Sequence, residues 1–133
     1  MAMSSVRAGQ VRYPSQRLRN SRYGTHPPVR QAIDPAVAAV FQVDVHDLRA
    51  RTRRSPRTAF ARQVAMYLAH VVCGLSLTEV GTLFARDRST VAHACGVVED
   101  RRDDPELDGK LDHLEAAVCA LMDALSMRYG GCR

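Results

Sequence analysis

The sequence contains no apolar run approaching the ~20 residues that a membrane-spanning helix needs, and no charged-then-apolar leader at its N-terminus. We therefore expect a cytoplasmic protein with no membrane partner. Its 133 residues have the size of one domain, long enough for one modest core but short for two.

Cysteine is scarce, and no two cysteines form a C-x-x-C pair. The four are Cys73, Cys95, Cys119 and Cys132. Three of them fall inside apolar helical patterns, so we expect buried or incidental thiols rather than disulfides or a zinc site. No histidine pairs with another ligand type at metal spacing, and no cofactor is expected. No nucleophile–base pair or pair of carboxylates stands at catalytic spacing, which argues against an enzyme with a small-molecule substrate.

Acidic residues are nearly absent from the first half of the chain. Residues 1–62 hold 12 arginines against three aspartates, a balance of +9, whereas residues 63–133 hold 7 basic and 11 acidic side chains, a balance of −4. This division predicts an anionic partner for the first half. Because Lys110 is the only lysine, genomic base composition is the alternative explanation for part of the arginine excess.

The ends of the chain carry little apolar periodicity. Residues 1–29 contain Gly, Pro, Ser and scattered Arg with no acidic residue, which predicts a disordered basic arm. Order is expected to begin near Asp34-Pro35, where Asp can cap a helix and Pro can take its first position. Gly130-Gly131 then marks a flexible tail over residues 128–133. The folded domain is expected over residues 30–127.

Between these ends the apolar spacing predicts only helices. Expected helices cover residues 35–43 and 44–48, a longer stretch from Thr58 to Gly74, a short helix from Ser76, a further one after Asp87, and a last one from Pro105. The last carries a long stripe, which is most simply a core face; a dimerisation surface is the alternative. The stripe consists of Leu107, Leu111, Leu114, Val118, Leu121, Met122 and Leu125.

A basic run precedes the long central helix. Residues 49–57 contain five arginines and no acid, and Pro56 resists continuation of a helix. Such a run is usually a solvated surface. Because five clustered guanidinium groups repel one another, we favour a loop that contacts phosphates.

The segment FARDRSTVAHACGVVED, residues 84–100, places four polar residues ahead of an apolar stripe. The short helix expected before it opens at Ser76-Leu-Thr-Glu79, which has capping-box spacing. Two short helices joined by a three- to four-residue turn form a helix-turn-helix. The start of the second helix in that motif enters the major groove and meets base edges. The pattern therefore predicts binding to double-stranded DNA.

The polar residues of this segment have chemistry suited to DNA. Asp87 fits a helix cap, with a contact to a cytosine amino group as the alternative. Arg88 is unfavourable at the positive end of a helix dipole and is better explained by a guanine edge or a phosphate. Ser89 and Thr90 can contact phosphate or a thymine methyl group, or cap the helix. His93, one turn on, points the same way, with a solvent or packing role as the alternative.

The stretch ARQVAMYLAHVVCGLSLTEVGTLFARDRSTVAHAC, residues 61–95, resembles the C-terminal DNA-binding domain of the bacterial chromosomal replication initiator DnaA. The similarity covers roughly residues 31–125 and implies an all-α, Trp-repressor-like helix-turn-helix bundle. It further implies that Asp87 to Thr90 touch bases or adjacent phosphates, that Arg62 and Gln63 hold the phosphate backbone, and that the loop from Arg53 to Arg57 enters the minor groove. The candidate DNA-binding residues are Arg53, Arg54, Arg57, Arg62, Gln63, Arg86, Asp87, Arg88, Ser89, Thr90 and His93.

The sequence departs from the family at several of these positions. The family usually has histidine at Arg88, two glycines at Ala85, proline at Ala61 and a basic residue at Pro56. These changes leave general duplex binding in place and put the family's own origin box in doubt. Nothing matches G-x-x-x-x-G-K-[ST], so no ATP hydrolysis is expected.

Two functions remain open at this point. The first is a nucleoid-associated, sequence-specific regulator of replication initiation or transcription. The second is a protein-interaction module whose C-terminal helix pairs with itself or a partner through Leu114, Val118 and Leu121.

Overall fold

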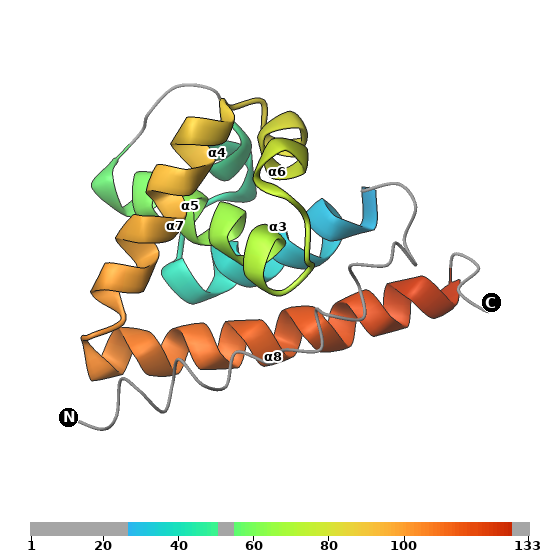
Figure 1. Cartoon of the computed structure of the whole chain (residues 1–133). Coiled ribbons are helices and arrows are strands. Elements are labelled where there is room, and N and C mark those ends of the chain that lie inside the picture. The colour runs from blue at the N-terminus through green and yellow to red at the C-terminus, as the bar shows by residue number, and fades with distance from the viewer. Residues whose placement is uncertain (1–26, 51–54, 129–133) are drawn as a thin grey trace.

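The protein is a helical bundle, described here in a computed structural model for residues 27–50 and 55–128. Those residues form six helices and no strand, which confirms the all-α prediction (Figure 1). The helices are α3 (Pro27–Phe41), α4 (Val45–Arg49), α5 (Pro56–Val71), α6 (Leu77–Phe84), α7 (Arg88–Arg101) and α8 (Pro105–Arg128). Most of the expected arm and tail lies outside the described residues. No helix among those described is both long enough and apolar enough to span a membrane.

Helix α3 begins earlier than its sequence pattern predicts. The prediction that Asp34 caps a helix starting at Pro35 is wrong, because α3 starts at Pro27 and runs through both residues. A proline inside a helix leaves the carbonyl four residues before it without its usual partner. Pro35 and Gln31 are both exposed, so water can reach that carbonyl and the helix continues.

Asp34 is fully buried and binds two arginines instead of capping a helix. Its Oδ2 accepts from Nε of Arg30, one turn earlier in α3, at 2.9 Å and from Nε of Arg49, at the end of α4, at 2.7 Å. A buried carboxylate needs such partners to offset its lost hydration. The Asp-Pro pair resembled a helix start in sequence because the pairing of Asp34 with Arg30 and Arg49 appears only in the folded structure.

Helix α5 lies at the centre of the bundle and packs against α3, α4, α6 and α7. It begins at Pro56 rather than at Thr58, with Pro56 in the first turn and Ser55 as its cap. The Ser55 hydroxyl accepts from the Thr58 amide at 3.1 Å. The helix ends at Val71 with Val72 as its C-cap, and Gly74 follows in the turn with a φ of 75°, the left-handed conformation that favours glycine after a helix.

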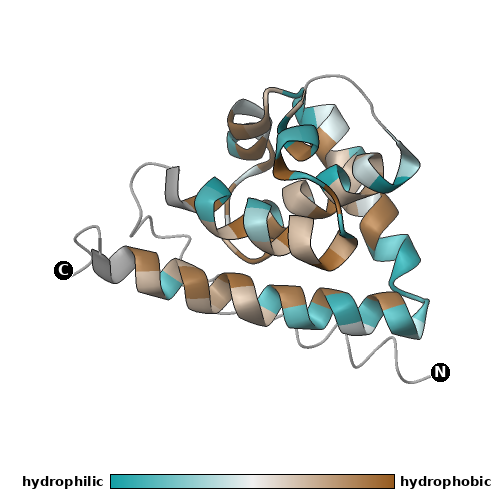
Figure 2. Cartoon of the chain, turned by 180° about the vertical axis from the view of Figure 1, so that it is seen from behind, coloured by the Kyte–Doolittle hydropathy of each residue, from teal (hydrophilic) through white to brown (hydrophobic). Residues whose placement is uncertain are grey.

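Helix α8 packs along α3 (Figure 1). Hydrophobic residues recur along its length between hydrophilic ones (Figure 2). Four stripe residues are buried within the chain's own core: Leu111, Leu114, Val118 and Met122. Leu121 is 41% exposed. Two of the three residues named for a dimer surface are thus unavailable to a partner, and the stripe acts as a core face.

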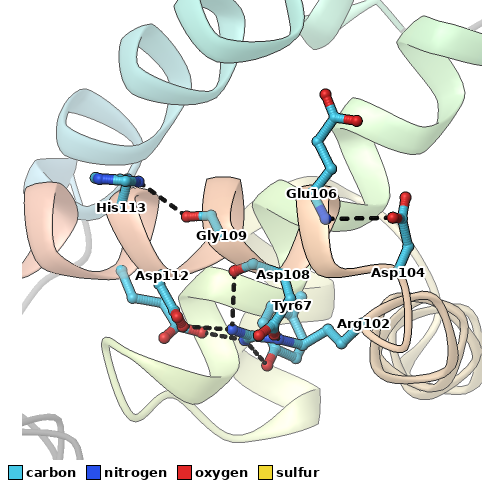
Figure 3. A network of polar contacts seen from close by, with 9 residues as sticks. Tyr67, Arg102, Asp104, Glu106, Asp108, Gly109, Asp112 and His113 are labelled. Atoms are coloured by element: carbon cyan, nitrogen blue, oxygen red, sulfur yellow. Dashed lines mark hydrogen bonds and ion pairs between the residues drawn. The ribbon is translucent and has the colours of Figure 1, made fainter.

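An arginine network fixes the corner between α7 and α8 (Figure 3). The guanidinium of Arg102 donates to carboxylate oxygens of Asp108, Asp112 and Glu115, each at 2.6 Å, and to the Tyr67 hydroxyl at 2.9 Å. Burial alone lowers the pKa of Arg102, but the hydrogen bonds to Asp108 and Glu115 and the charge of Glu115 outweigh it and raise that pKa. Burial raises the pKa of Tyr67 to about 12, so its hydroxyl stays neutral. The network ties α5, the corner and α8 together.

Replacement of Arg102 should destabilise the fold strongly. Arg102→Met removes the guanidinium from buried Glu115 and partly buried Asp108, and breaking such a buried pair costs about 3–5 kcal/mol of unfolding free energy. Guanidinium chloride unfolding measures this loss. Arg101→Met is the matched control, because Arg101 is exposed and stacks on the Phe60 ring at 4.3 Å, so about 1 kcal/mol or less is expected. Equal losses for both variants would contradict the network's role.

Candidate nucleic-acid interface

Helix α6 begins with the predicted capping box. The Ser76 hydroxyl accepts from the Glu79 amide at 3.0 Å, and the Glu79 carboxylate accepts from the Ser76 amide at 2.8 Å. Two otherwise unpaired amides are satisfied in this way. The box fixes the start of a helix that is only eight residues long, so the orientation of α6 is set locally.

The turn from α6 to α7 is tight. Ala85 ends α6 in the left-handed conformation, with φ 58° and ψ 49°, and the Arg86 amide donates to the Gly81 carbonyl at 2.8 Å. A Cβ at Gly81 would lie 2.6 Å from the Arg86 carbonyl oxygen, closer than real Cβ contacts. Gly81 therefore lets the turn close. The sequence signal for this constraint was an isolated glycine inside a short helix, and it was missed.

Helix α7 is amphipathic at its start. Val91, Ala94 and Val98 are buried against the bundle, whereas the four candidates Arg88, Ser89, Thr90 and His93 are exposed. The apolar stripe thus holds α7 in place while its opposite face remains open to solvent. The predicted helix-turn-helix is present, and the structure brings these four candidates together at one end of α7.

The expected cap at Asp87 is absent. Asp87 occupies the N-cap position of α7, but its side chain makes no capping hydrogen bond and is exposed. The prediction that this carboxylate caps the helix is therefore wrong. Asp87 still lies directly before Arg88 at the start of α7. The amides in the first turn of α7 receive no bond from the Asp87 side chain. They add to the positive end of the helix dipole, which attracts phosphate.

An open hollow separates the start of α7 from α6. Its walls include Thr78 and Thr82 of α6, and Arg86, Arg88 and Thr90 from the turn and α7. Hydroxyl and guanidinium groups of this kind bind phosphate oxygens and base edges. Four candidates, Arg86, Asp87, Arg88 and Thr90, therefore share one concave surface.

The candidates at the start of α5 occupy different environments. Arg57 is exposed and Gln63 is half-buried. Arg62 is 9% exposed, and its guanidinium donates to the carbonyls of Leu48 at 3.1 Å and Asp47 at 3.0 Å. Arg62 therefore ties α5 to α4, a role that sequence reasoning did not foresee. Its role in holding phosphate stays a prediction. Arg53 and Arg54 lie outside the described residues.

The remaining titratable groups show no sign of a metal site. Within residues 27–50 and 55–128, no three His, Cys, Asp or Glu side chains are grouped so as to hold a metal ion. Cys73 and Cys95 are free thiols, the first buried and the second half-buried. Burial raises the pKa of Cys73 to about 12 and that of Cys95 to about 11, so both stay protonated and unreactive near neutral pH.

Comparisons with known proteins agree with this geometry. The family described as the bacterial DnaA protein helix-turn-helix matches residues 31–98. The chain is 42% identical over 71 residues to the chromosomal replication initiator protein DnaA 2 of Chlamydia muridarum, covering 53% of this chain and 15% of that protein. It is 48% identical over 66 residues to DnaA 1 of Protochlamydia amoebophila, covering 50% and 14%.

A third relative extends the similarity. The DnaA protein of Symbiobacterium thermophilum is 35% identical over 102 residues, covering 71% of this chain and 22% of that protein. The match thus spans less than a quarter of the length of each of these three curated relatives.

The close contact at Gly81 gives a direct test of the turn. Gly81→Ala should lower the unfolding free energy by about 1–3 kcal/mol, because the added Cβ must displace backbone. Gly96→Ala is the matched control within α7, because nothing lies within 4 Å of a Cβ there. It should raise stability by about 0.5–1 kcal/mol through helix propensity. Urea unfolding of both variants measures the difference, and opposite signs are expected. A stabilised Gly81→Ala would show that the turn has room to spare.

Proposed function

The chain belongs to the bacterial DnaA helix-turn-helix family, and we propose that it binds double-stranded DNA sequence-specifically through the start of α7. Within this family the domain is the DNA-binding part of replication initiators. We propose that the protein acts on the nucleoid by regulating replication initiation or transcription.

The observation that carries this proposal is the exposed polar start of α7. Four neighbouring residues, Asp87 to Thr90, are exposed at the helix N-terminus, while Val91 and Ala94 fix the opposite face in the core. A recognition helix needs this division, because its N-terminal side chains enter the major groove while the bundle stays outside. Packing within the chain gives the polar residues no comparable role.

Arg88 is the main candidate for reading a base. Arg88 is exposed, and its side chain makes no hydrogen bond or ion pair within the part of the chain that the structure describes. A cation in the first turn of a helix opposes the dipole and lowers stability slightly. A bidentate contact to guanine, the commonest specific contact of arginine, would offset that cost. Asp87, whose carboxylate does not cap the helix, can accept from a cytosine amino group.

The candidates on α5 are assigned to the DNA backbone. Arg57 is exposed in the first turn of α5, where a guanidinium can reach a phosphate without reading sequence. Gln63 is assigned the same role. Arg62 supports them by holding α4 and α5 together through two backbone carbonyls. Arg53 and Arg54 are assigned to the minor groove on the family resemblance alone.

The target site is proposed to differ from the family's origin box. Arg88 stands where the family usually has histidine, and a longer, permanently charged side chain reads a base edge differently. We also propose that residues 1–133 act without ATP hydrolysis, since the phosphate-binding loop motif is absent from them. The protein-interaction alternative loses two of its three named residues, because Leu114 and Val118 are buried in the core and Leu121 alone is exposed.

We keep the domain limits proposed from the sequence, although the outer helix ends differ from them by a few residues. Residues 30–127 form the folded unit, preceded by a basic arm and followed by a short tail. Helix α3 begins at Pro27 and α8 ends at Arg128, so each limit lies within a few residues of a helix end.

Removal of the Arg88 guanidinium should weaken specific binding and relax base preference. Arg88→Ala is expected to cost about 1–3 kcal/mol on the preferred duplex and much less on a scrambled one. Fluorescence anisotropy at two salt concentrations, with an origin-box duplex, a scrambled duplex and an enriched random-pool sequence, measures this difference. Enrichment of a sequence other than the origin box is the expected result for the unmodified protein.

Two controls separate base reading from general binding. Arg57→Ala should weaken binding to all duplexes alike and reduce the salt slope by about 1. Lys110→Ala removes one exposed charge from α8 and should leave specific binding unchanged. Equal losses on specific and scrambled DNA for Arg88→Ala would defeat the base-reading role. Failure of the unmodified protein to bind any duplex at low salt would defeat the proposal.

A further inference from the structure

A second hollow lies on the other side of the α6–α7 turn. Four different parts of the fold each contribute one arginine to its walls: Arg30 from α3, Arg49 from α4, Arg62 from α5 and Arg86 from the turn. No acidic residue lines it. Its volume is about 140 Å³, well below the roughly 300–1,000 Å³ of pockets for drug-sized ligands. The hollow therefore suits a small anionic group.

Two of the four arginines at the hollow share a single acidic partner. Arg30 and Arg49 share one carboxylate, that of the fully buried Asp34. Two guanidinium groups against one carboxylate leave a net charge of +1 in this group of three. Arg62 and Arg86 then bring two further guanidinium groups to the same walls. Like charges gathered at one surface repel each other, and an anion placed between them relieves that repulsion.

Two of the arginines are held in place before any ligand arrives. The Arg30 guanidinium lies 4.0 Å from the centre of the Phe84 ring, is paired with Asp34, and donates to the Leu83 carbonyl at 3.4 Å. Arg62 is fixed by the two carbonyls of the α4 end. Side chains fixed in this way lose little conformational entropy when a ligand binds. Arg49, whose side chain is 50% exposed, lies at the edge of the site.

The hollow adjoins the proposed DNA-reading surface. Ala85 and Arg86 line it and also line the open hollow between α6 and the start of α7. A duplex whose major groove receives α7 has a sugar-phosphate strand along each edge of that groove. The arginines lie immediately across the turn from α7, where such a strand would pass.

We infer that this four-arginine hollow is a phosphate-binding site. Guanidinium groups bind phosphate oxygens in bidentate geometry. Its occupant on DNA is a backbone phosphodiester beside the groove that α7 enters, an assignment that rests on the proposed function. A free phosphate group has the same chemistry and is the other source. This site adds Arg30, which no sequence pattern indicated. It also adds Arg49, which belongs to the basic run of residues 49–57 predicted to contact phosphates but was not among the individually named candidates.

The first arm of the test measures the salt dependence of duplex binding by the full-length protein. Arg49→Gln and Arg86→Gln each remove one guanidinium from the walls, and each should lower the slope of log K against log salt by about 0.9. Lys110→Gln is the matched control, with the same loss of charge at an exposed position on α8, and its slope should equal that of the unmodified protein. Melting temperatures verify that each variant is folded.

The second arm uses inorganic phosphate without DNA. Phosphate should raise the melting temperature of the unmodified protein and of Lys110→Gln above the value in sodium chloride of equal ionic strength. Arg49→Gln and Arg86→Gln should lose that increment. The main measurement in this arm is the melting temperature of the unmodified protein with and without phosphate. It therefore tests the phosphate site even where a variant is poorly folded.

The two arms separate the sources and the two proposals. A fall in salt slope confined to Arg49→Gln and Arg86→Gln supports the DNA backbone as occupant. Phosphate stabilisation without a slope change supports the site with free phosphate as its ligand. Phosphate stabilisation in a protein that binds no duplex sinks the proposed function and keeps the site. Duplex binding with equal slopes in all variants and no phosphate effect overturns the site and keeps the proposed function.

Discussion

The tight turn between α6 and α7 is the constraint on which the binding surface depends. The Arg86 amide reaches back to the Gly81 carbonyl at 2.8 Å, and Ala85 adopts a left-handed conformation that glycine adopts more readily. This closure fixes where α7 starts and which way its first residues point. The burial of Val91, Ala94 and Val98 then keeps Arg88, Ser89 and Thr90 outside the bundle. The hollows on the two sides of the turn share its residues.

Arginine has two separate roles in this fold. Arg102 holds the α7–α8 corner through three carboxylates, and Arg30 is paired with the buried Asp34. Arg57 and Arg88, by contrast, are exposed. A count of charge along the sequence cannot separate these roles, because pairing and burial depend on how the helices pack. The strongly basic first half thus contributes both to the core and to the surface proposed to meet DNA.

Local signals in the sequence predicted most of the helices. The Ser76–Glu79 capping box and the termination at Gly74 are confirmed, because caps and stops depend on residues within one turn. The start of α3 was predicted wrongly, since Asp34 is buried and pairs with Arg30 and Arg49 instead of capping a helix. The cluster from Asp87 to Thr90 was found from its polarity alone. Arg30 was missed as a site residue, because only the assembled bundle places it beside Arg49 and Arg86.

An amide NMR titration of the full-length protein with its preferred duplex tests the central claim most directly. The account predicts that the largest shift changes occur at the start of α7 and in the α6–α7 turn, with further changes at the start of α5. The exposed face of α8, including Lys110 and Leu121, should change little. Changes confined to α8, or none at the start of α7, would contradict the claim that this helix-turn-helix reads DNA.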